Sequence, residues 1–162
     1  MSTKNQPETP NTDADFALWR LINHTTFLIN RSREKELAQF HITPEQAHVM
    51  DVLHNSGGTS TIQNIVNITM RQHHSISTLL NRMALQGLIK KTKNPHDARQ
   101  YSVTFTTKGQ TLFNKITHHT ITEVFSVLSE RDQKGLNVKL KKLMFKAYKV
   151  LGKKFQPIES AD

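Results

Sequence analysis

The spacing of hydrophobic residues along the chain predicts a protein made mostly of helices. Over six segments, apolar side chains recur three and four residues apart, as they do where one face of a helix is buried. The predicted helices cover about residues 13–37, 44–55, 61–67, 70–86, 107–128 and 130–151. After the fourth helix the period becomes two, and Leu88-Ile89 and Tyr101/Val103/Phe105 are typical of two short strands.

Capping residues mark the starts of most of these helices. Thr43-Pro44-Glu45-Gln46 offers an N-cap, a proline at the first helical position and a return acceptor three residues after the cap. The same spacing recurs at Ser60/Gln63, Thr69/Gln72 and Thr107/Gln110, and Ser129 precedes the acidic residues of the last helix. Asn55-Ser56-Gly57-Gly58 is a helix-ending signal.

The central part of the chain has the layout of a winged helix-turn-helix. Within residues 41–106, a short helix and a tight turn lead into another helix and then into the hairpin. We predict a mainly α fold with a small β-hairpin wing, flanked by long helices at 13–40 and 107–155. Residues 1–12 and 156–162 are polar, and we expect a disordered lead-in and a polar tail there.

The positive charge of the chain is concentrated in two segments. The net charge is +9; residues 71–99 hold six Lys and Arg against one Asp, and residues 131–154 hold nine against one. Localised basic charge is typical of a protein with a polyanionic partner, usually nucleic acid. The alternative is a solvated surface that keeps the protein soluble, which we favour for the second segment.

The fourth predicted helix has a polar face without carboxylates. Its apolar face holds Ile76, Leu79, Leu80 and Met83. The opposite face, at about 100° per residue, shows Arg71, His74, Ser75, Thr78, Asn81 and Arg82. These groups suit base edges and phosphates, and a helix fits the major groove of DNA. The alternative is an ordinary amphipathic surface helix.

A basic cluster is expected at the tip of the hairpin. Lys93, His96 and Arg99 lie in or beside the turn, and Arg99 could enter a minor groove or follow the DNA backbone. Asp97 could orient an arginine through a charge-assisted hydrogen bond. The alternative is an exposed turn stabilised by the Asp97 side chain.

Several classes of function are disfavoured by what the sequence lacks. Without cysteine there is no disulfide or thiol chemistry, and without a phosphate-binding Gly loop or a nucleophile elbow we expect no enzyme. No segment is apolar enough for a secretory signal or a membrane span, so we expect a cytoplasmic protein that does not contact membranes. The nine histidines form no i, i+4 pair, but a metal site using His41, His48 or His118, or a proton sensor, stays open.

The segment STLLNRMALQGLIKKTKNPHDARQYSVTFTTKGQTLF, residues 77–113, resembles the core signature of the MarR-type transcriptional regulators. Its parts are Arg82-Met83, Gly87-Leu88-Ile89 with basic residues after it, an Asp-x-Arg wing (Asp97, Arg99) and Thr-x-Lys-Gly (Thr106, Lys108, Gly109). The likeness in length and element order extends over about residues 13–151. His73-His74 departs from the family pattern, where small or hydroxyl residues are commoner, which affects the expected base preference.

The resemblance implies a homodimer that places one reading helix and one wing on each half of a palindromic DNA operator, with repression expected. No cofactor is required, but similar proteins often bind small aromatic or phenolic acids between the dimerisation helices and the winged domain. Residues that could line such a site are Trp19, Ile22, His24, Phe27, Arg31, His41, His48 and Phe113. Alternatively, Trp19 and Phe27 lie in the dimer core and the histidines on the surface. A metal- or pH-responsive regulator of the same fold and a module that binds RNA or protein are the rival functions.

Overall fold

The computed structural model describes residues 12–93 and 101–153, and its architecture is mainly helical with one small sheet. The helices are α1 (Thr12–Ala38), α2 (Pro44–Asn55), α3 (Ile62–Thr69), α4 (His73–Leu85), α5 (Thr107–Lys115), α6 (His119–Phe125) and α7 (Glu130–Val150). The strands are β1 (Thr59–Thr61), β2 (Ile89–Lys93) and β3 (Tyr101–Phe105). None of the helices in the described ranges is long and apolar enough to cross a membrane.

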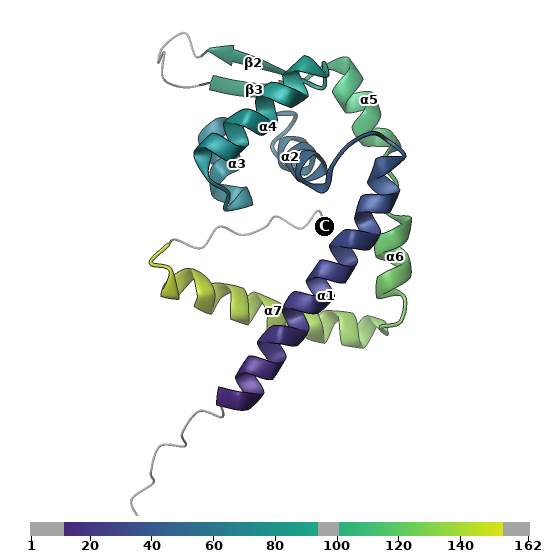
Figure 1. Ribbon diagram of the computed structural model, residues 1–162, viewed down its shortest axis with the longest axis vertical. Helices are drawn as coiled ribbons and strands as arrows, with labels where there is room; N and C mark the ends of the chain where they lie inside the picture. Colours follow the sequence, from purple (N-terminus) through teal and green to yellow (C-terminus); the bar gives the residue numbers. More distant parts are fainter. Residues whose placement is uncertain (1–11, 94–100, 154–162) are drawn as a thin grey trace, which may run out of the picture.

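The elements divide into a winged domain and a set of long helices (Figure 1). At one end of the view, α2, α3 and α4 lie beside the hairpin of β2 and β3, while α1 and α7 extend at the other end. Helices α5 and α6 run down one side and join the two parts. This arrangement confirms the predicted fold class, a winged helix-turn-helix with flanking helices. The proposed lead-in and the tail beyond residue 153 lie outside the described residues.

The sheet has three antiparallel strands in the order β1-β3-β2, so β3 is central. In the hairpin, Ile89 pairs with Phe105 and Lys93 with Tyr101. The sequence predicted β2 and β3 but not β1. Strand β1 has only three residues, Thr-Ser-Thr, and no apolar alternation, so its place is fixed by pairing with β3.

The core of the described residues lies in the winged domain. The side chains of Ile65, Ile76, Leu80, Met83 and Val103 are fully inaccessible to solvent. The predicted apolar face of the fourth helix is therefore buried, as expected. By contrast, no residue of α7 is buried in the single chain.

One predicted helix is two helices in the structure. The expected helix over 107–128 ends at Lys115, and α6 begins only at His119. The reason is Glu36 of α1, which is 7% exposed and whose carboxylate accepts hydrogen bonds from the Thr117 hydroxyl, from His119 N (3.0 Å) and from Thr120 N (3.3 Å). This carboxylate satisfies two free N–H groups at the start of α6, where the side chain of the N-cap residue, His118, forms no capping hydrogen bond.

Two of the five predicted N-cap residues are confirmed. In the other three helices, the N-cap is a different residue, one to three positions away from the predicted one. Thr43 forms the full capping box with Gln46, and Ser129 accepts from Asp132 N. Helix α3 is capped by Thr61 in place of Ser60, and α5 by Thr106 in place of Thr107. The predicted cap of the fourth helix, Thr69, is the last residue of α3, and its hydroxyl donates to the carbonyl of Ile65 (2.7 Å); helix α4 begins after Gln72, which forms no side-chain cap.

Candidate nucleic-acid interface

The helix-turn-helix consists of α3, a three-residue turn and α4. Met70 ends α3 in the left-handed conformation, with φ of 56°, which turns the chain sharply before α4. Helix α4 then buries Ile76, Leu79, Leu80 and Met83 against the rest of the winged domain. Burial of that face fixes which side of α4 meets solvent.

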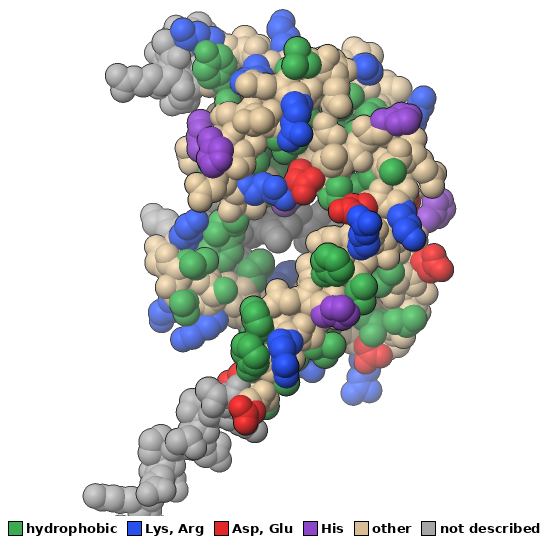
Figure 2. Space-filling model, viewed as in Figure 1, with side chains coloured by type: hydrophobic (Ala, Val, Ile, Leu, Met, Phe, Trp, Pro, Cys, Tyr) green, Lys and Arg blue, Asp and Glu red, His purple; other side chains and the backbone are tan. Residues whose placement is uncertain are grey.

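The outward side of α4 carries most of the residues that the sequence assigned to it. His74, Thr78, Asn81 and Arg82 are exposed, and Ser75 is half-buried. The helix contains no acidic residue between His73 and Leu85. Figure 2 shows histidine, lysine and arginine side chains over the α3, α4 and hairpin region. The structure therefore offers a surface of neutral and cationic hydrogen-bonding groups on an exposed helix.

Arg71 does not belong to α4, because the helix begins at His73, three residues later than predicted. Its guanidinium donates to Glu45 of α2, with an Nη2–Oε1 distance of 3.2 Å, and both side chains are partly exposed. The pKa of Glu45 is lowered, chiefly by the hydrogen bond from its own backbone N–H, with Arg71 contributing. The pair connects α2 to the turn that leads into α4.

The hairpin is joined to α4 by a residue that the sequence reasoning missed. Lys91 of β2 donates to Asn81 Oδ1 over 2.7 Å, and its ammonium lies 5.5 Å from the centre of the Tyr101 ring. The position of Lys91 in the basic run after Leu88-Ile89 was visible, but its contact with α4 was not. Lys93 is exposed at the end of β2. The remaining predicted wing residues, His96, Asp97 and Arg99, lie outside the described residues.

The residues proposed to line an effector site are not gathered in one place. Trp19, His24 and Phe27 are exposed on α1, the two rings to 57% and 63%. Arg31 forms an ion pair with Glu34 at 2.6 Å, and Ile22 is half-buried. Phe113 packs inside the winged domain, with ring centres 4.7 Å from His54 and 5.8 Å from Phe105.

His41 and His48 line two different cavities. The cavity that includes His48 has a volume of about 470 Å³ and lies between α1, α2 and α6, where Arg33, Asp51 and His118 also line it. Desolvation raises the pKa of Asp51, although the charges of His48, His118 and Arg33 oppose this. This cavity occupies the predicted position between the flanking helices and the winged domain.

The cavity that includes His41 has a volume of about 490 Å³ and lies between the end of α1, the turn after α4 and α5. A third cavity, of about 520 Å³, opens beside Glu36 and α6. Within residues 12–93 and 101–153, no group of three or more His, Cys, Asp or Glu is placed to hold a metal ion.

Comparison with known proteins agrees with this architecture. The chain is 20% identical to the organohalide-sensing transcriptional regulator RdhR in its 2,4-dichlorophenol-bound form, with a TM-score of 0.81 over 99% of each chain. It is 20% identical to a variant of MarR from E. coli complexed with operator DNA (TM-score 0.75, 84% of this chain, 99% of that one). It is 26% identical to MepR from S. aureus in a DNA complex (TM-score 0.70, 81% and 96%).

The search of curated protein sequences gives no match to this chain. A model of the MarR family, however, matches residues 42–100, a segment that includes α2, β1, α3, α4 and β2. The solved structures extend the likeness from that segment to the flanking helices. Over residues 42–100 the chain therefore matches the MarR family, and along its full length it shares the fold of solved MarR-family structures.

Proposed function

We propose that the chain binds double-stranded DNA sequence-specifically as a homodimer and represses transcription from a palindromic operator. The observation that carries this proposal is the outward side of α4, which is exposed, free of acidic residues and tied to a cationic strand. Hydrogen bonds to base edges from such a helix specify sequence, whereas cations beside it bind phosphates whatever the sequence.

We assign a DNA contact to each residue of α4 from its position on the exposed side of the helix. Thr78 and Asn81 lie in the middle of the outward side of α4, so we assign them to base edges. His74 and Ser75 lie near the N-terminus of α4, where backbone N–H groups also favour a phosphate. Arg82 is exposed near the other end of the helix and suits the backbone.

The wing and the turn before α4 supply the remaining contacts in this proposal. Lys93 is the last residue of β2, and we assign it to phosphate. Arg71 is held by Glu45 beside the first turn of α4, from where it reaches a neighbouring phosphate. The roles of His96, Asp97 and Arg99, which lie outside the described residues, rest on the sequence.

A homodimer is supported by apolar surface on the flanking helices. Phe16, Trp19 and Phe27 of α1 are each more than half exposed, and α7 exposes Leu140 and Leu143. Figure 2 shows hydrophobic side chains along α1. Apolar surface of this extent is typical of an interface, and a second copy of the same helices would cover it.

Release by a small aromatic or phenolic ligand is a further part of the proposal. RdhR, which shares the fold, is described with 2,4-dichlorophenol bound. The cavity between α1, α2 and α6 is lined by Arg33, His48 and His118, which are suitable partners for an acidic group. It also includes Arg71, so an anion there competes with Glu45 for the residue that precedes α4.

The test is selection of bound duplexes from a random pool, followed by affinity measurements at two salt concentrations. Arg82→Ala and Arg99→Ala should weaken binding to every duplex and reduce the salt slope by about one each. Thr78→Ala and Asn81→Ala should change which bases are preferred. Lys142→Ala, on exposed α7, is the matched charge control and should leave both properties unchanged. Binding without sequence preference, or full binding by all four variants, would exclude the proposed interface.

A further inference from the structure

The side chain of Asn81, in the middle of the outward side of α4, is held in one orientation by Lys91. Successive residues of β2 point to opposite faces of the sheet, so Lys91 lies on the same face as the buried Ile89, whereas Lys90 lies on the other face. The Lys91 ammonium is 2.7 Å from Asn81 Oδ1. Because an ammonium can only donate, the atom that it contacts must be the oxygen of the amide and not the nitrogen.

A second contact fixes the position of the Lys91 ammonium. Lys91 pairs with Val103 across the hairpin, and its ammonium lies 5.5 Å from the centre of the ring of Tyr101, two residues from Val103 on the same face of β3. Lys91 is half-buried and Asn81 is exposed. The bond between them therefore lies where the hairpin meets the outward side of α4. The amino group of Asn81 is the part of the amide that Lys91 does not engage.

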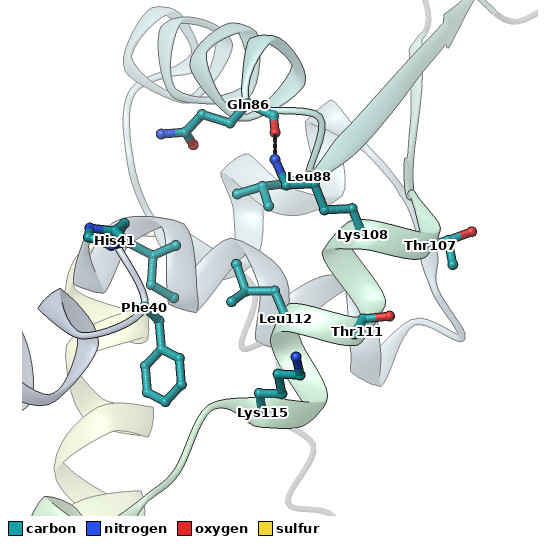
Figure 3. Close-up of a pocket in the computed structure, with 10 residues that line it drawn as sticks. Phe40, His41, Gln86, Leu88, Thr107, Lys108, Thr111, Leu112 and Lys115 are labelled. Atoms are coloured by element: carbon teal, nitrogen blue, oxygen red, sulfur yellow. Dashed lines mark hydrogen bonds between the residues drawn. The ribbon is translucent and has the colours of Figure 1, made fainter.

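The short connection between α4 and β2 keeps these two elements in register. Only Gln86, Gly87 and Leu88 separate the helix from the strand. Lys108 Nζ donates to the backbone carbonyl of Gln86 over 2.7 Å (Figure 3), and the Thr106 hydroxyl donates to that of Gly87 over 2.6 Å. The side chain of Leu88 is buried. The contact between α4 and the hairpin is thus formed before any ligand arrives, so little conformational freedom is lost on binding.

This arrangement presents hydrogen-bond donors to the major groove of DNA. Asparagine reads adenine by accepting from N6 and donating to N7 at the same time, which requires its amide oxygen. An adenine amino group that approached Asn81 Oδ1 would meet the Lys91 ammonium, donor against donor, and one of the two would lose its acceptor. Guanine instead presents two acceptors, N7 and O6. The amino group of Asn81 and the remaining N–H groups of Lys91 match these acceptors.

We propose that Asn81 and Lys91 together select guanine, and reject adenine, at one base pair of the DNA site. Lys91 acts as a positioning residue for the amide and as the second donor. This inference rests on the proposed function and deepens it, because it names the base that the middle of α4 prefers. An isolated asparagine would favour adenine, so the contact with the hairpin reverses the preference of the side chain.

The test is selection of bound duplexes from a random pool with the full-length chain and three variants. Asn81→Ala identifies the base pair in question, because the preference there is lost. At that base pair the wild type should bind guanine at least about fivefold more tightly than adenine. Lys91→Met should remove this difference, since the amide oxygen becomes available to adenine. Lys90→Met removes the same charge from the other face of β2 and should keep the guanine preference. Without DNA, the NMR signals of the Asn81 side-chain amide should shift in Lys91→Met and not in Lys90→Met.

The outcomes separate this inference from the proposed function. A base other than guanine at the Asn81 position, no position changed by Asn81→Ala, or a guanine preference that persists in Lys91→Met overturns the inference, while sequence-specific binding stands. Unshifted amide signals in Lys91→Met overturn the contact itself. The wild-type preference decides the inference even if Lys91→Met fails to fold. If the wild type binds no duplex with sequence preference, the proposed function fails and this inference fails with it.

Discussion

The carboxylate of Glu36 joins α1 to the start of α6, and replacing it with glutamine should weaken that junction measurably. The carboxylate accepts from Arg33 Nη1 at 2.6 Å as well as from Thr117 and from the N–H groups of His119 and Thr120. A glutamine in its place keeps one acceptor oxygen and turns an NH2 group toward donors. At least two of these donors then lose their partner.

The size of the expected loss of stability can be estimated from the pKa of Glu36. Burial alone would raise the pKa of Glu36, but the hydrogen bonds from Thr117, Arg33 and Thr120 outweigh it and lower the pKa from 4.5 to about 2. Such a difference corresponds to about 3 kcal/mol of stability at neutral pH. Because Glu36 borders an open cavity and solvent screens the charges, we expect Glu36→Gln to lower the free energy of unfolding by about 2 kcal/mol.

The stability that the Glu36 carboxylate contributes should decrease as the pH falls. The folded state has the lower pKa, so the carboxylate stabilises it fully above pH 4.5 and loses this contribution as the pH falls toward 2. Urea unfolding of the wild type and Glu36→Gln, at one protein concentration, should therefore give curves that differ at pH 7, lie closer together at about pH 3 and converge near pH 2. Glu34→Gln is the matched control, since Glu34 forms only an exposed pair with Arg31, and should cost less than about 0.5 kcal/mol. Equal losses for the two variants at pH 7, or a difference as large at about pH 2 as at pH 7, would refute this reasoning.

Further predictions concern close contacts and the hairpin. A Cβ at Gly109 would lie 1.9 Å from the carbonyl oxygen of Leu88, so Gly109→Ala should lower the free energy of unfolding by about 3 kcal/mol or more, and a loss below about 1 kcal/mol would contradict the packing. Gly135→Ala, in the middle of α7 with nothing within 4 Å, should instead raise it by up to about 1 kcal/mol in the same urea experiment. Lys91→Met should free Asn81 and broaden the base preference at one operator position in duplex selection, with less than about 1 kcal/mol change in stability. An unchanged preference would show that Asn81 does not depend on Lys91.

Periodicity predicted the parts of the fold that depend on local pattern. The spacing of Ile76, Leu79, Leu80 and Met83 selects one side of a helix, and burial of that side determines which residues of α4 remain exposed. The same argument gave the extents of α1, α2 and α7 to within about one residue. The capping box at Thr43 was equally local, since all its atoms belong to four consecutive residues.

The sequence-based predictions of helices, strands and caps are wrong where contacts with residues distant in the sequence determine the structure. The chain breaks between α5 and α6 because Glu36, more than 80 residues earlier, accepts from the start of α6. Strand β1 exists because Thr59–Thr61 meets β3, not because of its own sequence. Neighbouring hydroxyl residues such as Ser60 and Thr61 are equivalent as caps in sequence, and only the path of the chain selects one.

The sequence predicted which residues of α4 are exposed at the candidate site, but it did not predict how α4 contacts the neighbouring elements. Exposure of Thr78 and Asn81 followed from the helical period, whereas the Lys91 contact depends on how the hairpin lies against α4. No spacing along the chain indicates that His41 and His48 face different cavities. Cavities form where separate elements meet, so their lining requires the tertiary structure.

The lysines of β2 have a consequence for solubility. Strand β2 lies at one edge of the three-stranded sheet, and it carries Lys90, Lys91 and Lys93. The backbone of an edge strand can pair with the edge of another molecule, and lysine side chains there oppose such pairing by charge repulsion and hydration. Removing these lysines to weaken a nucleic-acid contact would therefore also remove a protection against edge-to-edge aggregation.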